Sequence, residues 1–435
     1  MCAPSHPGLT SATTSNPAIG ASLLKPGAER VGTTGWAERR PARLRAMTSQ
    51  FPLDGIRVID FSRVLAGPLI GQLLADLGAD VIKVERPDGG DDTRAWGPPW
   101  KNYAADGEPE DLEATYFMSL NRNKRSVALD LKDDDDIAFA RRLALTGDIV
   151  LDNFRPGFMA KIGLDQESLA ADKASIITAS VTAFGSTSDA AHLPGLDLAV
   201  QGMAGIMHLT GEDGERPLRA GVPVVDMLTG YNTTVGVLAA LHAVNKTGSG
   251  CHVEVSLMDA GLAGLLNHQT GVMMGGQNPG RGGNKHYSIA PYESYSCADG
   301  DMIVAAANDR LYANLCHAIS RSDLIDDPRF VTNTLRRQNV GELNEILEPI
   351  FRTDTRARWV ERLQGAQVAC GPVNSLPEAL AWAEQMGMEP QIDGPDGYQA
   401  VRNPIRLDGE VINTARLRPP RTGEHSAEIR AEVDE

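Results

Sequence analysis

The stretch that decides the fold is "GIRVIDFSRVLAGPLIGQLLADLGADVIKVERP", residues 55–87. Residues 55–62 and residues 79–87 each contain an apolar run that predicts a buried strand. Between them, residues 67–78 have the length and spacing of a helix, with a proline in the first turn and a glycine at the end. A strand, a helix and a strand in this order predict two parallel strands joined by a right-handed crossover.

The same alternation continues toward the C-terminus. Residues 126–131, 148–154 and 175–185 are predicted strands, and the segments between them, such as "DDDDIAFARRLALTG", are predicted helices. Repeated units of this kind predict a doubly wound α/β domain.

The second half of the chain has a different pattern. Residues 229–276 are predicted to be mainly helical, and the glycine-rich segment 275–288 follows. A smaller α+β unit comes next, with a hairpin that turns at Asp299-Gly300 and several helices after it. From about Pro390 onward, loops and short strands are predicted.

The composition is that of a globular protein, and it excludes several classes of partner. The chain has 435 residues, of which 42% are hydrophobic and 23% charged, and its net charge is −16. This negative charge argues against nucleic acid and against an anionic membrane surface as partners. The five cysteines form no CxxC pair, so we expect no disulfide framework or metal site, and a reducing, cytoplasmic compartment fits. We also expect no apolar run long enough to span a bilayer.

The N-terminal segment differs from the rest of the chain. Residues 1–49 are rich in Pro, Ser, Thr and Gly, show no periodicity, and are predicted to be a disordered extension. The arginines of "AERRPARLRAM" permit a transit peptide, but Glu29 and Glu38 argue against one. Our interpretation is a start codon assigned too far upstream, because Met47 directly precedes the first predicted element.

The common cofactor and nucleophile motifs are absent. The turn "FSRVLAGPLIG" lacks the G-x-G-x-x-G spacing of a dinucleotide site, and no Walker, H-E-x-x-H or G-x-S-x-G pattern occurs. A nucleophile in this chain is therefore expected to be a carboxylate. One candidate is Asp226 in "GVPVVDMLTG", an acid in apolar surroundings with no basic residue in the stretch. Its alternative role is that of a helix N-cap, whose carboxylate accepts backbone N–H groups.

Several stretches, in order along the chain, resemble one family. They are "LDGIRVIDFSRVLAGPLIGQLLADLGADVIKVERPDGGDDTR", "LNRNKRSVALDLK", "LDNFRPGFMAKIGLD", "PGLDLAVQGMAGIMHLTG", "GVPVVDMLTGYNTTVGVLAALHAVNKTGSGCHVEVSLMDA" and "SIAPYESYSCADGDMIVAAANDRLYANLC". From about Leu53 to the C-terminus, the chain is similar to family III CoA-transferases, the CaiB/BaiF group. Several long motifs in register make this resemblance more specific than any single motif.

The resemblance implies the architecture. Family members have an α/β fold with a large Rossmann-like domain, a smaller α+β domain and a C-terminal segment that returns to the large domain. Two chains form an interlocked homodimer. The implied limits are 1–49 for the extension, 50–257 for the large CoA-binding domain, 258–281 for a linker with the glycine-rich loop, 282–385 for the small domain and 386–435 for the returning segment.

The resemblance also implies that Asp226 is the nucleophile. Its carboxylate would attack the carbonyl of an acyl-CoA to give a mixed anhydride, which the released CoA would convert to an aspartyl-CoA thioester. Acyl-CoA and a carboxylic acid would be the substrates, and no permanently bound cofactor is implied. Because water would destroy either intermediate, the apolar flank of Asp226 suits this role.

Two other hypotheses remain open beside the transferase. In the racemase branch, a His in the segment matching "GLDLAV" works with the nucleophile's equivalent as a two-base pair. Leu196 stands at that position here, which disfavours exchange of an α-proton. The adjacent Asp197 matches a supporting acid of formyl-CoA transferase, and its alternative role is a helix N-terminal acid. A CoA-binding protein without turnover is the third hypothesis, and retention of Asp226 argues against it.

The CoA contacts are carried over position by position. Arg86 matches a contact on the adenine side of CoA, and its alternative is a solvated surface pair with Glu85. Leu65 replaces a Gln of formyl-CoA transferase, which argues against formyl-CoA and oxalate as the substrate pair. Lys161 replaces an Arg, which keeps the charge and loses the planar fork. The positions that match CoA-lining residues are Leu65, Ala66, Leu129, Asn153, Phe154, Lys161 and Ile162.

The expected acceptor is a dicarboxylate. "DFSRVLAGP", "GDDTRAWGPP" and "GIMHLTG" look most like the branch that includes succinyl-CoA:glutarate CoA-transferases, so succinyl-CoA is the expected donor. The distal carboxylate of the acceptor needs a cation, and the candidates are Arg63, Arg281, Lys285 and His286. The segment "GGQNPGRGG" has the place of a loop that closes over the reacting centre, and a flexible interdomain linker is its alternative.

Overall fold

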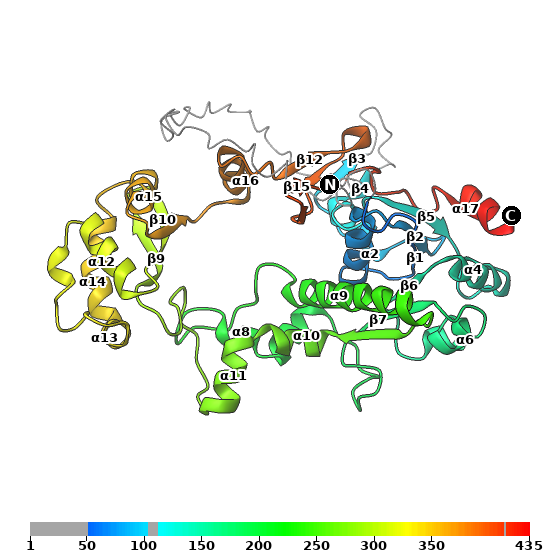
Figure 1. Cartoon of the computed structure of the whole chain (residues 1–435), viewed down its shortest axis with the longest axis horizontal. Coiled ribbons are helices and arrows are strands. Elements are labelled where there is room, and N and C mark those ends of the chain that lie inside the picture. Colours follow the sequence, from blue (N-terminus) through cyan, green and yellow to red (C-terminus); the bar gives the residue numbers. More distant parts are fainter. Residues whose placement is uncertain (1–50, 103–111, 413–414) are drawn as a thin grey trace, which may run out of the picture.

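The predicted apolar runs form five strands of a six-stranded parallel sheet in the computed structural model, which describes residues 51–102, 112–412 and 415–435 (Figure 1). The predicted disordered extension, residues 1–49, and its start-codon interpretation lie outside the described residues. The sheet has the order β5-β2-β1-β6-β7-β8, and every neighbouring pair is parallel. Its strands are β1 (Arg57–Asp60), β2 (Asp80–Glu85), β5 (Lys124–Ala128), β6 (Ile149–Asp152), β7 (Ile177–Thr182) and β8 (His252–Ser256).

The direction of winding reverses between β1 and β6. From β1 the chain moves outward to β2 and β5, then returns to β6 beside β1 and continues outward to β7 and β8. In open sheets of this kind, ligands bind in the crevice at the carboxyl ends of the two strands where the order reverses. The segments that follow β1 and β6 are therefore the expected walls of a site.

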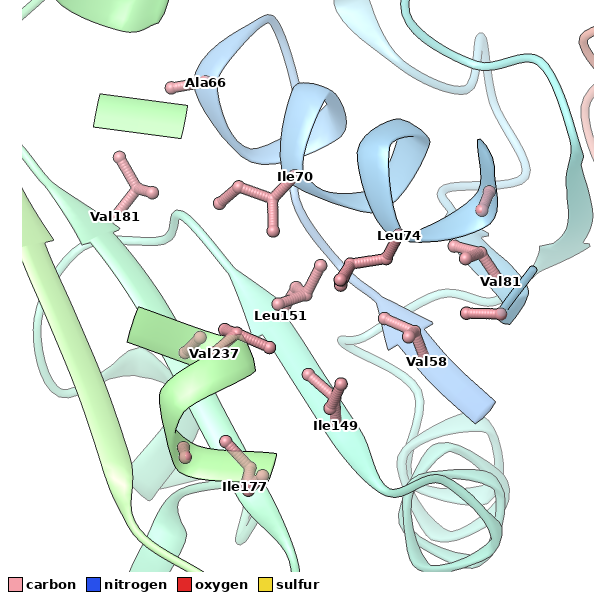
Figure 2. Packing of buried hydrophobic residues seen from close by; sticks show 14 of the residues in the cluster. Val58, Ala66, Ile70, Leu74, Val81, Ile149, Leu151, Ile177, Val181 and Val237 are labelled. Carbon is pink, nitrogen blue, oxygen red and sulfur yellow. The ribbon is translucent and has the colours of Figure 1, made fainter. Parts of the chain in front are cut away.

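One face of the sheet packs against α2 (Ala66–Asp76) and α9 (Val224–Thr247). Figure 2 shows Ile70 and Leu74 of α2 above Leu151 of β6, with Val237 of α9 close to the same strand. These side chains belong to one buried cluster, which continues across the sheet to β2 and β7. The apolar runs of the strands are thus explained by burial on both faces, as expected for a parallel sheet.

The opposite face is covered by α4 (Asp134–Thr146), α6 (Gln166–Ala170) and the C-terminal α17 (Ser426–Asp434). Ile59 points to this face although Val58 points to the other, because successive residues of a strand alternate between faces. The sequence predicted loops and short strands at the C-terminus, and α17 corrects that prediction.

The helix α9 has 24 residues and carries the candidate nucleophile near its start. By length and composition alone α9 could cross a membrane, because its mean hydropathy is 1.2. The sequence predicted no apolar run long enough to span a bilayer and therefore did not identify this helix. In the structure, Val225, Val237 and Ala240 of α9 are buried with residues of α2 and the sheet. This packing is that of a core helix.

A second unit contains an antiparallel sheet of order β11-β10-β9, and Figure 1 places it at the far end of the molecule from the parallel sheet. Tyr295, Leu315, Phe351 and Trp359 form part of its core. The hairpin between β9 and β10 turns at Ala298-Asp299, one residue before the predicted turn, because Cys297 pairs with Gly300. Its elements are β9 (Tyr292–Cys297), β10 (Gly300–Ala305), α12 (Asp309–Ala318), α13 (Asn333–Gln338), α14 (Val340–Phe351), α15 (Arg356–Gly365) and β11 (Ala369–Pro372).

The remaining elements connect the two units or cover the ends of the large sheet. β8 lies inside the region predicted to be mainly helical, so the sequence missed the sixth strand. After α16, the chain returns to the large unit, where the Tyr398 hydroxyl donates to the Met118 carbonyl at 3.0 Å. These elements are β3 (Trp100–Asn102), β4 (Leu112–Ala114), α3 (Thr115–Met118), α5 (Phe158–Lys161), α7 (Asp197–Met203), α8 (Ile206–Leu209), α10 (Leu257–Gly264), α11 (Leu266–Gly275), α16 (Leu376–Gln385), β12 (Gln391–Asp393), β13 (Gln399–Val401), β14 (Arg406–Leu407) and β15 (Glu410–Val411).

Candidate active site

A cavity of about 420 Å³ lies at the reversal of the sheet, where a site is expected. Its walls come from the turn after β1, the loops after β6 and β7, and the first turn of α9. It brings together seven of the residues that the sequence singled out, which are Arg63, Leu65, Ala66, Asn153, Phe154, Leu196 and Asp226. The fold therefore joins segments that are far apart in the sequence, from Arg63 to Leu257, around one acid.

Asp226 is the third residue of α9 and does not cap it. Pro223 occupies the N-cap position, and its side chain makes no capping hydrogen bond. The carboxylate of Asp197 performs the capping, because its Oδ1 accepts the N–H groups of Val225 at 2.8 Å and of Asp226 at 3.2 Å. The interpretation of Asp226 as an N-cap is therefore wrong, and its carboxylate is left for another role.

The carboxylate of Asp226 is poorly solvated. Burial is the largest cause that raises its pKa, the negative charge of Asp197 adds to this, and together they bring the pKa to about 7. No hydrogen bond or cation from the described residues opposes these effects. Near neutral pH the group is thus divided between its acid form and a carboxylate that lacks the usual stabilisation.

Asp197 acts on the site through the backbone. It is the first residue of α7, as its alternative role predicted, and its Oδ2 accepts a hydrogen bond from Gln201 Nε2 at 2.5 Å. Gln201 is fully buried, and its Oε1 accepts the Ala220 N–H at 2.9 Å. Asp197 does not line the cavity of Asp226, so it holds the first turn of α9 in place and places a negative charge near the candidate nucleophile.

Tyr116 is a neighbour of the site that sequence reasoning missed. Burial raises the pKa of its hydroxyl, and the charges of Asp226 and Asp197 raise it further, which places this ring close to both acids. The ring packs edge-on against Trp96 at a centroid distance of 5.4 Å. No local motif marks Tyr116, because only the fold brings α3 near α9.

A second cavity of about 290 Å³ adjoins the first, since Arg63 and Phe154 line both. It contains Arg86 and Leu129, two of the expected CoA contacts, together with Lys132. The lining of the second cavity includes four basic residues and three acidic ones, and the first cavity contains Asp226. The arrangement suits an elongated anion with a reactive group at one end.

The partner of Arg86 is not the one that the sequence suggested. Its guanidinium donates to Asp92 at 2.6 Å and is half exposed toward solvent. Glu85 instead accepts two hydrogen bonds from Arg94, at 2.7 and 2.8 Å, and both of those side chains are buried. The alternative of a Glu85–Arg86 surface pair is therefore wrong.

Three other predicted contacts have different surroundings from those expected. Lys161 ends α5 and is exposed, Ile162 packs against the sheet, and neither lines the two cavities. The amide of Asn153 is occupied by the backbone of Arg63, accepting its N–H at 2.9 Å and donating to its carbonyl at 2.6 Å. Asn153 therefore lines the cavity while its amide shapes the adjacent turn.

The candidate cations for an acceptor are distributed over different places. Arg63 lines the cavity of Asp226, whereas Lys285 and His286 line a third cavity of about 630 Å³ that also contains a histidine and an arginine, His268 and Arg337. Arg281 lines neither of these two cavities, and its Nε donates to a backbone carbonyl at 3.3 Å.

The glycine-rich segment is anchored away from the acid. The N–H of Gly283 donates to the carbonyl of Gly211 at 3.0 Å, and the segment lines the third cavity together with α11. Within one chain, it therefore does not border the cavity of Asp226. Leu196, at the position of a racemase histidine, does border it, and no histidine is among the described residues that line that cavity.

Comparison with known proteins identifies the family. A family model described as CoA-transferase family III matches residues 53–426. The succinate–glutarate CoA-transferase of Agrobacterium fabrum is 41% identical over 392 residues, which cover 88% of this chain and 96% of the relative. The succinyl-CoA:glutarate CoA-transferase of Homo sapiens is 34% identical over 386 residues, covering 88% of this chain and 86% of the relative.

A solved structure agrees with this match. A CaiB/BaiF family protein from Brucella suis is 38% identical, covers 88% of this chain and all of its own length (100%), and superposes with a TM-score of 0.79. The resemblance read from the motifs is confirmed by both comparisons. The strand order of the parallel sheet reverses beside Asp226, and the family model matches nearly the whole described chain. We conclude that the protein belongs to CoA-transferase family III.

Proposed function

We propose that this protein transfers CoA from succinyl-CoA to a second dicarboxylate, with Asp226 as the nucleophile. The observation that carries the proposal is the carboxylate of Asp226, which lies in a cavity without a hydrogen-bonding partner among the described residues and has a pKa raised to about 7. The names of relatives that act on succinate, glutarate or mesaconate support a dicarboxylate acceptor.

The reaction conserves the energy of the thioester in four steps. The Asp226 carboxylate attacks the thioester carbonyl and expels CoA thiolate, which leaves a mixed anhydride. The thiolate attacks the aspartyl carbonyl, releases the donor acid and forms an aspartyl-CoA thioester. The acceptor carboxylate attacks that thioester, expels the thiolate again and forms a second anhydride. The thiolate then attacks the acceptor carbonyl, which releases the new acyl-CoA and restores the Asp226 carboxylate.

The surroundings of Asp226 support nucleophilic attack. A carboxylate with strong hydrogen bonds or a paired cation is stabilised and reacts slowly, whereas burial and the charge of Asp197 destabilise the anion of Asp226. Its neighbours Val224, Val225 and Leu228 are apolar, which limits the water that could hydrolyse an anhydride.

The adjoining cavities support an extended path for the donor. The adenosine phosphates bind Arg86 and Lys132 in the second cavity, and the thioester reaches the cavity of Asp226. Arg63 borders both cavities and is the side chain past which the thioester must run.

The distal carboxylate of the acceptor binds Lys285 and His286 in this proposal. Their cavity contains a further histidine and arginine, whereas Arg63 already has an aspartate at 3.7 Å. This cavity shares no lining residue with that of Asp226, so we propose that a second copy of the chain brings the two together. The function therefore includes a homodimer, interlocked as the family resemblance implies.

Trapping the intermediate tests the function. The full-length protein is mixed with succinyl-CoA, treated with hydroxylamine or borohydride, digested and analysed by mass spectrometry. Modification at Asp226, its absence in the Asp226→Asn variant, and transfer to glutarate support the proposal. An unmodified Asp226 with CoA bound indicates a binding protein, and α-proton exchange in deuterated water without transfer indicates a racemase.

Mixed dimers test the assignment of the acceptor site. Asp226→Asn and Lys285→Gln/His286→Gln chains carry different tags and are co-expressed, so that dimers with one chain of each kind can be purified. If the two cavities of one site come from different chains, the mixed dimer keeps one intact site and about half of the wild-type activity, whereas each parental dimer is impaired. A mixed dimer no more active than the parents overturns the assignment.

The cytoplasm is the proposed compartment. The four described cysteines, Cys251, Cys297, Cys316 and Cys370, are free, which supports a reducing environment. Cell fractionation of the natural host, with an antibody against this chain, tests the compartment.

A further inference from the structure

The backbone of the turn after β1 is held by side chains from three other segments. Lys83 Nζ, from β2, donates to the Ser62 carbonyl at 2.8 Å. Asn153, after β6, binds both the N–H and the carbonyl of Arg63. Asp91 Oδ1, from the loop that follows β2, accepts the N–H of Val64 at 3.3 Å. Three successive residues are thus fixed by groups that come from elsewhere in the sequence.

Val64 explains why such a turn needs to be held. Its φ is 72°, in the left-handed region, which a β-branched residue rarely adopts because its side chain crowds the backbone. Without the contacts described above, Val64 would adopt an extended conformation, which would change the direction of the chain. Strained conformations of this kind persist only when the surrounding structure determines them, and they concentrate near functional sites.

The ion pair between Lys83 and Asp91 is the centre of this arrangement. The two side chains are fully buried (0% exposed), and Nζ lies 2.9 Å from Oδ2. Burial acts to raise the pKa of Asp91, but the Lys83 ammonium and two hydrogen bonds from Thr93 outweigh it and bring the pKa to about 2. The pair therefore remains charged throughout the working pH range, and each partner keeps its contact with the turn.

The turn leads directly to the wall of the cavity opposite the acid. Leu65 and Ala66 follow Val64 and line the cavity of Asp226. The first turn of α2 has no side-chain cap, and it lies close to α9, where a Cβ added at Gly230 would be 3.0 Å from the Ala66 carbonyl oxygen. A change of conformation at Val64 would therefore move the start of α2 relative to the first turn of α9.

We infer that Lys83 and Asp91 are positioning residues for CoA transfer: by holding Val64 in the left-handed conformation, they fix Leu65 and Ala66 against Asp226. The inference rests on the proposed role of Asp226. It goes beyond that role because Lys83 and Asp91, which line the second cavity with fully buried side chains, act on the reacting centre through the turn.

The test compares two buried ion pairs at opposite ends of α2. The Lys83→Met/Asp91→Asn variant removes the pair beside the turn. The matched control is Arg122→Met/Asp76→Asn, because those two side chains are also buried, pair at 2.6 Å and lie at the far end of the helix. We expect kcat to fall at least tenfold in the first variant, with KM for the acyl-CoA within about threefold of wild type. In the control we expect kcat to remain within about threefold.

Substitution of Val64 separates positioning from a general loss of structure. Glycine adopts the left-handed region without strain, and Val64 itself lines the cavity of Asp226, so Val64→Gly alone supplies the reference kcat for the variants that carry it. In the Lys83→Met/Asp91→Asn background, the same substitution should restore most of the lost kcat, because the turn no longer needs to be held. If the double variant does not fold, Lys83→Gln/Asp91→Asn, which replaces the buried ion pair by two neutral amides, gives the same comparison with and without Val64→Gly.

A readout without activity keeps the inference separate from the proposed function. A crystal structure of the variant without the ion pair should show residue 64 with negative φ, and Val64→Gly should return φ to positive values. An unchanged φ, a loss of kcat equal to that of the control, or no recovery with glycine overturns the inference. Failure to label Asp226 in the wild-type protein would instead contradict the proposed function, whatever φ residue 64 adopts.

Discussion

Replacing Asp226 by asparagine should change both the chemistry and the stability of the protein. Burial and the charge of Asp197 raise the pKa of Asp226 to about 7 from its ordinary value of 3.8. When an acid has a higher pKa in the folded state than in the unfolded chain, its contribution to the free energy of unfolding is complete below the unfolded pKa. That contribution is lost as the pH rises through the folded pKa. Since each pKa unit corresponds to about 1.4 kcal/mol, ionisation at about pH 8 costs the folded wild-type protein about 4 kcal/mol. The Asp226→Asn variant does not titrate and avoids this cost.

The assay is urea unfolding of both proteins at several pH values between about 4 and about 8. The free energy of unfolding of Asp226→Asn should gain on that of the wild type by up to about 4 kcal/mol across this range, while CoA transfer is absent throughout. Asp189→Asn is the control for replacing a carboxylate by an amide at an exposed position. A difference between Asp226→Asn and wild type that does not change with pH would refute the reasoning, since the carboxylate of Asp226 would then be as hydrated in the folded protein as in the unfolded chain.

The remaining predictions concern three charged groups around the site. Asp197→Asn keeps an oxygen that can accept the Val225 N–H but removes the negative charge that raises the pKa of Asp226. The pH at half-maximal kcat/KM should therefore fall, and an unchanged midpoint would contradict the electrostatic effect of Asp197. Arg86→Ala should raise KM for the acyl-CoA roughly tenfold or more in steady-state kinetics, because a charge-assisted hydrogen bond is worth about 1.5–3 kcal/mol, and an unchanged KM would exclude a CoA contact. Arg94→Met leaves its two buried glutamate partners unpaired, and urea unfolding should show a loss of about 3–5 kcal/mol; a loss below about 1 kcal/mol would contradict the importance of this network.

The parts of the fold that the sequence predicted are those where burial is nearly complete. The strands from β1 to β7 of the parallel sheet are covered by helices on both faces, so their apolar runs stand out. β8 lies at the edge of the sheet and pairs only with β7, and its sequence "HVEVS" alternates polar and apolar residues, which hid it among helical segments. α17 buries one residue, Ile429, and so lacked a clear periodic pattern.

Motifs predicted residues of the site, but they could not predict its geometry. Asp226 was identified through the resemblance, since its local sequence fits a helix N-cap equally well. The capping by Asp197, the position of Tyr116 and the binding of the Arg63 backbone by Asn153 all depend on contacts between distant segments. The partner of Arg86 was mispredicted for the same reason, because Asp92 comes near it only when the chain folds back after β2.

The return of the C-terminus to the first unit has a consequence for biosynthesis. Ile429 of α17 belongs to the same buried cluster as Phe139 and Leu143 of α4, nearly three hundred positions earlier. Until α17 has been translated, α4 and α6 cover that face of the sheet without it, and the part of the cluster that Ile429 contacts stays exposed to solvent. Until α17 is made, the new polypeptide therefore exposes part of this hydrophobic cluster to solvent. A stop codon before residue 426, which removes α17, should consequently expose the side of this cluster around Phe139 and favour aggregation of the product.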